Sequence, residues 1–142
     1  MRVSNCVFWL EDDGSKIEIG NYFSMESGHI ASTEGGNIRI GDDCMFSNDV
    51  EIRNGDSHPI LDMGTKRRIN SAKNVVICNH VWLTAHVRIL KGSYVPCDCI
   101  IGNSVIVTGV LAKSNSIYAG NPIHLIKENV NWERERKMYL NN

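Results

Sequence analysis

The sequence predicts an all-β fold, a triangular parallel β-helix in which three faces of six residues complete each turn. Between positions 77 and 112 the chain repeats every six residues, and an aliphatic residue opens each of six hexads: Ile77, Leu83, Ile89, Val95, Ile101 and Val107. Four residues after each opener comes a small or branched residue: Val81, Val87, Ser93, Cys99, Val105 or Leu111. A helix would space apolar residues by three and four, and a simple strand would alternate them. A strict period of six instead indicates stacked β units that bury their apolar faces against their neighbours.

An ordinary β-sandwich rich in Val and Ile is the alternative to this fold. Sandwich strands and turns vary in length, so a constant spacing of six favours the β-helix. We therefore expect all six hexad openers to be buried inside the helix.

The first half of the chain shows the same period less regularly. Residues 1–18 are expected to form a starting strand and a turn, and weak hexads then open at Ile19, Met25 and Ala31. The register slips over residues 32–39 and returns at Ile40, Phe46 and Ile52. At the next opening position stands His58, followed by Pro59. Because proline cannot donate to a β ladder, we expect the coil to break here and a loop over about residues 59–74 to protrude.

The repeat fades after Ala112, and Gly120-Asn121-Pro122 predicts a turn. Residues 131–140 are rich in Glu and Arg, and we expect them to form a short C-terminal helix that caps the open end of the β-helix. Residues 1–142 are predicted to form a single domain.

Composition argues against several classes of protein. The net charge is −1 with both signs mixed along the chain, which does not indicate a nucleic-acid partner. No apolar run is long enough to be a transmembrane segment, and the first residues lack the pattern of a signal peptide. The five cysteines (Cys6, Cys44, Cys78, Cys97 and Cys99) lack the spacing of a zinc site. We expect them to be free, mostly in the core, in a cytoplasmic protein.

Two residues stand out as candidates for chemistry. His58 interrupts the hexads beside a long loop, and a neutral imidazole is the usual general base near pH 7. A loop histidine without a role is the alternative. Trp82 holds an outward-facing place in its hexad, which suggests a ligand wall or a partner surface. A simple subunit contact would also explain it.

Other polar residues give weaker signals. His80 and His86 hold the same place in successive hexads, so they lie on adjacent faces, and a shared metal would need a second subunit. The run Lys66-Arg67-Arg68 on the loop resembles a solvated charge run, although it could also meet a phosphate or an acidic acceptor.

Three segments give the sequence a family resemblance: IRIGDDCMFSNDVEIRNGDSHPI (38–60), HVWLTAHVRILKG (80–92) and SIYAGNPIHLIK (116–127). Over about residues 38–132 the chain resembles the hexapeptide-repeat O-acetyltransferases that use acetyl-CoA, the group containing galactoside and polysaccharide acetyltransferases. The resemblance implies a left-handed β-helix, an exception to the usual right-handed crossover. It also implies a homotrimer with active sites between subunits, acetyl-CoA as co-substrate, and no metal.

The same resemblance assigns roles to single residues. His58 matches the catalytic histidine, and Trp82 matches the tryptophan at the cleft for CoA and acceptor. The remaining matched residues concern cofactor binding: backbone contacts at Ala85 and Asn103, a threonine near the adenine at Thr108, and basic residues near the CoA phosphates at His124 and Lys127. Ala85 and Asn103 are 18 residues apart, so we expect a column along CoA that includes them and Thr108. Gly109 stands where the family has lysine, and Lys113 is the candidate to replace it.

The predicted activity is transfer of an acetyl group from acetyl-CoA to a hydroxyl of a sugar or polysaccharide precursor. His58 would take the hydroxyl proton, and backbone N–H groups near residues 82–85 would hold the oxyanion. Two other functions are weighed against it. One is a zinc-dependent hydro-lyase like the trimeric β-helical carbonic anhydrases, with His58, His80 and His86 as ligands from two subunits. The other is a non-catalytic β-helix used for assembly.

Overall fold

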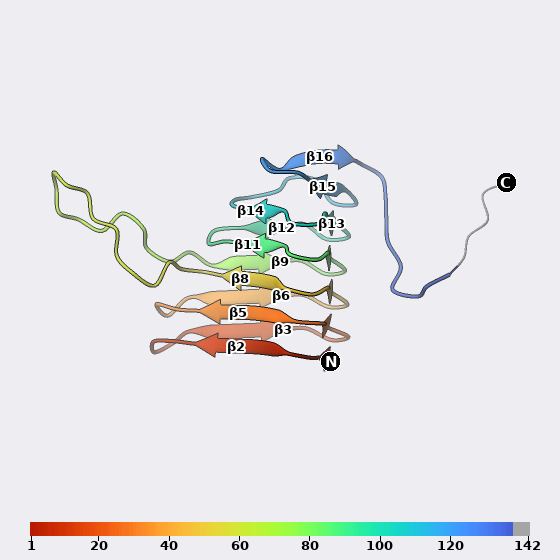
Figure 1. Ribbon diagram of the computed structural model, residues 1–142, viewed down its shortest axis with the longest axis horizontal. Helices are drawn as coiled ribbons and strands as arrows, with labels where there is room; N and C mark the ends of the chain where they lie inside the picture. Colours follow the sequence, from red (N-terminus) through yellow and green to blue (C-terminus); the bar gives the residue numbers. More distant parts are fainter. Residues whose placement is uncertain (138–142) are drawn as a thin grey trace.

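In the computed structural model, which describes residues 1–137, the chain winds as a helix of parallel strands about five turns long (Figure 1). Each turn passes through three sheets in a fixed order, named here A, B and C. Sheet A holds β1 (Arg2–Val3), β4 (Ser24–Met25), β7 (Met45–Phe46), β10 (Trp82–Leu83), β13 (Ile100–Ile101), β15 (Ile117–Ala119) and β16 (His124–Lys127). Sheet B holds β2 (Cys6–Leu10), β5 (Gly28–Ser32), β8 (Val50–Arg53), β11 (Arg88–Ile89) and β14 (Ile106–Val107). Sheet C holds β3 (Lys16–Ile19), β6 (Asn37–Ile40), β9 (Val75–Ile77) and β12 (Tyr94–Val95). This arrangement confirms the predicted parallel β-helix.

The pairing register gives the length of each coil. Trp82 in β10 pairs with Ile100 in β13, 18 residues later, as three hexads require. Nearer the N-terminus one coil takes 22 residues from β1 to β4 and 21 from β4 to β7. The extra residues lie between sheets B and C. There the outward-facing His29 and Arg39 are ten positions apart, whereas Arg88 and Tyr94 of a later coil are six apart. The wide turns at this B–C corner explain why the hexad period is weak before residue 40.

The six predicted hexad openers form the interior of the later coils. Ile77, Leu83, Ile89, Val95, Ile101 and Val107 are all buried, with at most 1% of their surface exposed. The polar exception among the predicted small residues is Ser93, which is also buried. Its hydroxyl donates to the carbonyls of Leu90 (2.6 Å) and Val107 (3.0 Å), so the core contains a satisfied polar group there.

The loop predicted from His58 and Pro59 leaves the helix at the B–C corner. β8 ends at Arg53 and sheet C resumes with β9 at Val75, so an entire loop replaces one corner turn. One antiparallel bridge, between Leu61 and Arg68, closes the outer part of the loop. In Figure 1 the loop projects well beyond the stacked coils.

The predicted C-terminal helix is wrong for the residues that the structure describes. Residues 131–137 contain no helix, and residues 138–140 of the predicted helix lie outside the described part. The last coil is instead covered by β16, which pairs antiparallel with β15. The chain then turns back beside the coils (Figure 1), because Trp132 and Arg134 bind to the corner between sheets C and A.

No helix in residues 1–137 is long and apolar enough to cross a membrane.

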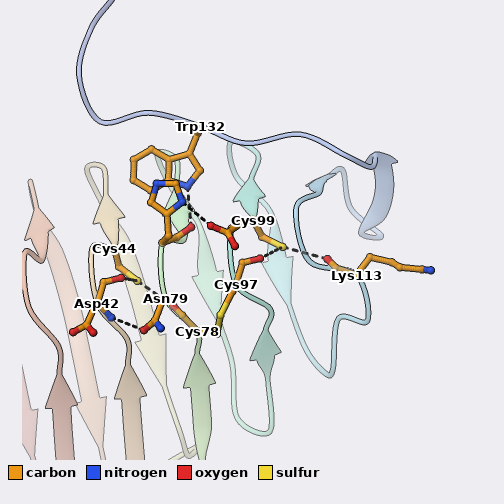
Figure 2. Close-up of a disulfide and its surroundings, with 10 residues drawn as sticks. Asp42, Cys44, Cys78, Asn79, Cys97, Cys99, Lys113 and Trp132 are labelled. Atoms are coloured by element: carbon orange, nitrogen blue, oxygen red, sulfur yellow. Dashed lines mark hydrogen bonds and ion pairs between the residues drawn. A yellow bond between two sulfur atoms is a disulfide. The ribbon is translucent and has the colours of Figure 1, made fainter.

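The expectation that all cysteines are free is also wrong. Cys44 and Cys99 are buried in the core, but Cys78 and Cys97 form a disulfide at the surface of the C–A corner (Figure 2). Their sequence separation is 19 and their Cα atoms are 4.6 Å apart. Stacking of coils places residues about 18 positions apart next to one another, so this pairing follows from the coil length.

Candidate active site

Asn70 fixes the backbone that carries His58. Its side chain is buried, with 6% of the residue exposed, and its Nδ2 donates to the His58 carbonyl (2.8 Å) and to Asp56 Oδ2 (3.1 Å). Its Oδ1 accepts the N–H of Ile60 (2.7 Å). The Asn70 amide therefore connects its own segment of the loop to the backbone before and after His58.

A second layer of charged residues holds Asn70 and the loop base. Lys91 pairs with Asp56 and donates to the Asn70 carbonyl (3.2 Å), and Arg68 pairs with Glu34 through both terminal nitrogens. The hydrogen bond from Lys91 lowers the pKa of the Asp56 carboxyl below its ordinary value. Sequence reasoning missed these residues, because hexad spacing carries no information about contacts between a loop and the coils beside it.

The His58 imidazole itself is exposed and open to a substrate. Its backbone N–H donates to the Asp56 carbonyl (2.8 Å), whereas its ring has no hydrogen-bond partner within residues 1–137. The preceding Ser57 has a φ of 67°, in the left-handed region. The loop therefore has a defined backbone at His58 and an unoccupied imidazole, which is the arrangement a general base needs.

Trp82 lies on a different face of the molecule. It belongs to β10 in sheet A, where its half-buried ring points outward between Met45 and Ile100 of the adjacent coils. It lines a groove of about 740 Å³ between sheet A and the C-terminal segment. The Trp132 ring lies beside the Trp82 ring, and the two ring centroids are 6.0 Å apart. The predicted pair is therefore not brought together within one chain, because His58 follows a strand of sheet B.

Of the three residues in the predicted CoA column, two stack. Ala85 and Asn103 occupy successive turns at the A–B corner, where the Ser104 N–H donates to the Ala85 carbonyl (2.9 Å). Thr108 follows β14 and so begins the next corner, between sheets B and C. The column prediction was wrong for Thr108, because a strand separates it from Asn103.

The two basic residues predicted near the phosphates, His124 and Lys127, lie at the C-terminal end of the β-helix and are exposed, as is Lys113, the candidate to replace the lysine missing at Gly109. His124 pairs with Ala119, close to the A–B corner that carries Asn103, and Lys127 pairs with Ile117 at the other end of β15. Lys113 lies at the C–A corner, where its Nζ is 3.7 Å from Glu128. A phosphate-bearing ligand on the A–B corner would therefore meet His124 first.

The other two histidines considered as metal ligands, His80 and His86, have acidic partners in the structure. His80 Nδ1 lies 2.8 Å from Asp98 Oδ1 at the C–A corner, and His86 Nδ1 lies 2.6 Å from Asp49 Oδ2 at the A–B corner. His58, His80 and His86 thus occupy three different corners. Within residues 1–137, no three His, Cys, Asp or Glu side chains are grouped so that they could hold a metal ion.

A parallel β-helix of hexad coils, broken by one long loop, defines the class of fold: that of the hexapeptide-repeat acetyltransferases. No family model matches the sequence. Two curated relatives do match: the polysialic acid O-acetyltransferases of Escherichia coli O1:K1 (41% identical over 127 residues) and of Neisseria meningitidis (42% over 123 residues). The matches cover 89% and 87% of this chain but only 41% and 56% of the relatives, so the chain spans about half their length.

Solved structures agree with these relatives. The polysialic acid O-acetyltransferase OatWY superposes with a TM-score of 0.86 and 38% identity, over 94% of this chain and 64% of that one. A galactoside acetyltransferase in complex with coenzyme A superposes with a TM-score of 0.69 and 27% identity, over 96% of this chain and 64% of that one. The chain is therefore homologous to polysialic acid O-acetyltransferases and other hexapeptide-repeat acetyltransferases, which confirms the predicted resemblance and left-handed β-helix.

Proposed function

We propose that this chain carries the transfer centre of an acetyl-CoA-dependent O-acetyltransferase whose acceptor is a polysaccharide containing sialic acid. The observation that carries the proposal is the 41–42% identity to two polysialic acid O-acetyltransferases over nearly nine-tenths of the chain. The loop also supports the proposal, because it presents a His58 imidazole that has no hydrogen-bond partner among residues 1–137. The zinc hydro-lyase alternative is not favoured, since the homologues are acetyltransferases.

In the proposed reaction, the acceptor hydroxyl attacks the thioester carbonyl of acetyl-CoA as His58 takes the hydroxyl proton. A C–O bond forms, the C–S bond breaks, and the imidazolium returns the proton to the leaving CoA thiolate. The Ala85 N–H is the candidate oxyanion donor. Trp82 and Thr84 donate to the carbonyls of Cys99 and Ile101, whereas no hydrogen bond within residues 1–137 uses the Ala85 N–H.

The stacked turns of Ala85 and Asn103 offer an edge for the donor molecule, and His124 at the end of that corner offers a ring N–H as a hydrogen-bond donor to its phosphates. Lys127, at the other end of β15 from His124, is a further candidate for contact with those phosphates. Because acetyl-CoA is a cytoplasmic metabolite, a cytoplasmic location is part of the proposal.

A homotrimer would complete this site. His58 and Trp82 belong to different faces of one chain, so a cleft containing both requires two copies. Cyclic assembly places one face of each copy against another face of its neighbour. Because His58 and Trp82 are far apart in one chain, we expect each active site to be formed by two neighbouring copies.

The decisive experiment measures CoA release from acetyl-CoA with oligosialic acid as acceptor. His58→Ala should lower turnover about 10²–10⁴-fold, as expected for loss of a general base. The variant should still be stabilised by CoA in a thermal shift, because the proposed CoA contacts lie elsewhere. A folded His58→Ala protein that binds CoA and turns over at the wild-type rate would reject the mechanism, and a wild type that CoA does not stabilise would favour the assembly alternative.

A further inference from the structure

A cavity of about 270 Å³ lies on sheet B beside the base of the His58 loop. Its walls include Trp9, His29, Ala31, Arg53 and Ser57, which come from three successive coils and from the loop. Ser57 directly precedes His58 in the chain, so the cavity opens next to the proposed base. The catalytic proposal above uses none of these wall residues.

The β register creates the cavity. Trp9, Ala31 and Arg53 pair in one outward-facing column across β2, β5 and β8. Adjacent strands are about 4.8 Å apart, so the tryptophan and the arginine stand roughly 10 Å apart with one small methyl group between them. A larger residue at position 31 would fill the space. The cavity is thus a gap between an aromatic wall and a cationic wall.

The side chains in the gap suit a sugar acid. Trp9 is 51% exposed and presents an apolar ring face, to which the C–H face of a sugar can pack. The Arg53 Nε pairs with Glu51, while its two terminal nitrogens have no partner among residues 1–137. That free fork matches the two oxygens of a carboxylate. On the floor, the buried His29 Nε2 also lacks a partner within the described residues, which is unusual for a buried polar atom.

Glu11 adds an acceptor at the rim. Its carboxylate accepts a hydrogen bond from Trp9 Nε1 (3.3 Å), which orients the indole ring. A carboxylate there would repel the acid group of a ligand but would accept hydrogen bonds from its hydroxyls. The cavity therefore distinguishes the two ends of an acidic sugar, with the acid group directed to Arg53.

We propose that this cavity is the subsite that selects a carboxylate-bearing sugar in the acceptor chain, with its carboxylate on Arg53 and its ring on Trp9. The inference rests on the proposed function, because the subsite would hold the acceptor beside His58. The cavity volume is below the roughly 300–1,000 Å³ of sites for drug-sized ligands and suits one sugar unit.

Equilibrium binding of oligosialic acid, measured by calorimetry without acetyl-CoA, tests the subsite independently of catalysis. Arg53→Gln should weaken binding about 10- to 100-fold, the effect of losing a charge-assisted bidentate pair. An oligomer with its carboxyl groups reduced to alcohols should bind the wild type and Arg53→Gln equally weakly. The matched control is Arg39→Gln, since Arg39 is an exposed arginine facing outward from sheet C, and it should leave binding unchanged.

Two further variants guard against effects on folding. Ala31→Val should block the cavity and weaken binding without removing any charge, and Trp9→Phe should bind better than Trp9→Ala because it keeps a ring face. If Arg53→Gln and Ala31→Val both bind oligosialic acid as the wild type does, the subsite is rejected even if acetyl transfer is observed. If the wild type binds the oligomer through Arg53 but transfers no acetyl group, the proposed function fails and the subsite stands.

Discussion

Asn70 shows how a single amide can control the position of a proposed catalytic group. It lies at the far end of the loop from His58 in sequence, yet it binds the His58 carbonyl, Asp56 and the Ile60 N–H. The reacting ring is exposed, so its position depends on this backbone clamp. Small displacements of reacting groups cost large factors in rate.

Asn70→Ala should therefore lower kcat for acetyl transfer roughly 10- to 100-fold while leaving the KM for acetyl-CoA unchanged. It should also destabilise the protein by about 1–3 kcal/mol, because buried partners lose hydrogen bonds. Steady-state kinetics and denaturant unfolding measure the two effects. Asn21→Ala is the control, since the exposed Asn21 side chain has no partner within residues 1–137. Equal kcat values for Asn70→Ala and Asn21→Ala would show that Asn70 does not position His58.

Burial controls the reactivity of the unpaired cysteines. Desolvation raises the pKa of the Cys44 thiol to about 11, and it also raises the pKa of Cys99 and of the partly exposed Cys6. Because the thiolate is the reactive form, Cys44 should remain uncharged and unmodified by iodoacetamide at pH 8 in the native protein. Mass spectrometry of the alkylated protein checks this, with urea-unfolded protein as the control. Rapid modification of native Cys44 would contradict its burial in the core.

In each two-residue strand of the later coils, one residue is buried and the other faces outward. In β12, Val95 is fully buried, whereas its neighbour Tyr94 is 37% exposed on the outer face. The same backbone thus presents one side chain to a stacked apolar column and the next to solvent. Alternation within each hexad is what makes so short a strand stable in a sheet of many coils.

Val95→Asp should prevent stable folding or cost at least about 4 kcal/mol, because it places an unpaired charge in that column. Tyr94→Asp, one residue away, should cost far less, since its side chain points to solvent. Urea unfolding followed by circular dichroism compares the two variants. Similar losses in both would mean that Val95 does not face the core.

The C-terminal segment is held by two side chains rather than by helix formation. The Trp132 ring stacks on His80 with centroids 4.1 Å apart, and its Nε1 donates to the His80 carbonyl (2.9 Å); Figure 2 shows the ring lying over this corner. Arg134 reaches Asp43, Ser24 and two backbone carbonyls on neighbouring coils. These contacts place the segment against the groove that contains Trp82.

Trp132→Ala should release this segment from the coils, with a loss of about 1–3 kcal/mol from the ring stack and the hydrogen bond. Hydrogen exchange of residues 130–137 should then become fast while the β-helix keeps its protection. Trp132→Phe keeps the stack but loses the N–H, so an intermediate effect is expected. Unchanged exchange in Trp132→Ala would show that Arg134 alone holds the segment.

Assembly determines whether the proposed site is complete, because one chain keeps His58 and Trp82 on separate faces. Mixing of two inactive variants tests this directly. If each site takes His58 from one copy and Trp82 from the next, every mixed trimer of His58→Ala and Trp82→Ala chains contains one intact site. A random 1:1 mixture, unfolded and refolded together, should then regain roughly a quarter of the wild-type rate.

Refolding each variant alone is the control and should regain no activity. Light scattering should show a trimer in every sample. No recovery in the mixture, with trimers present, would mean that both residues act within one chain. Activity of Trp82→Ala refolded alone would mean that Trp82 is not required.

The hexad openers could be read directly from the sequence because burial in this fold is decided by a local rule. Ile77, Val95 and their equivalents recur every six residues, since each coil packs the same face against its neighbours. His58 and Pro59 broke that rule, so the site of the loop was also evident. The spacing of 18 correctly placed Ala85 beside Asn103.

Features that depend on contacts between distant segments could not be predicted in this way. The helix expected over residues 131–140 was inferred from local composition, but within the described residues the tertiary contacts of Trp132 with His80 hold an extended segment. The Asn70 clamp and the Trp9–Arg53 cavity join residues on a loop or on the early, irregular coils, where the hexad period does not apply. Their geometry follows from the lengths of corner turns and loops, and these lengths are set by long-range packing.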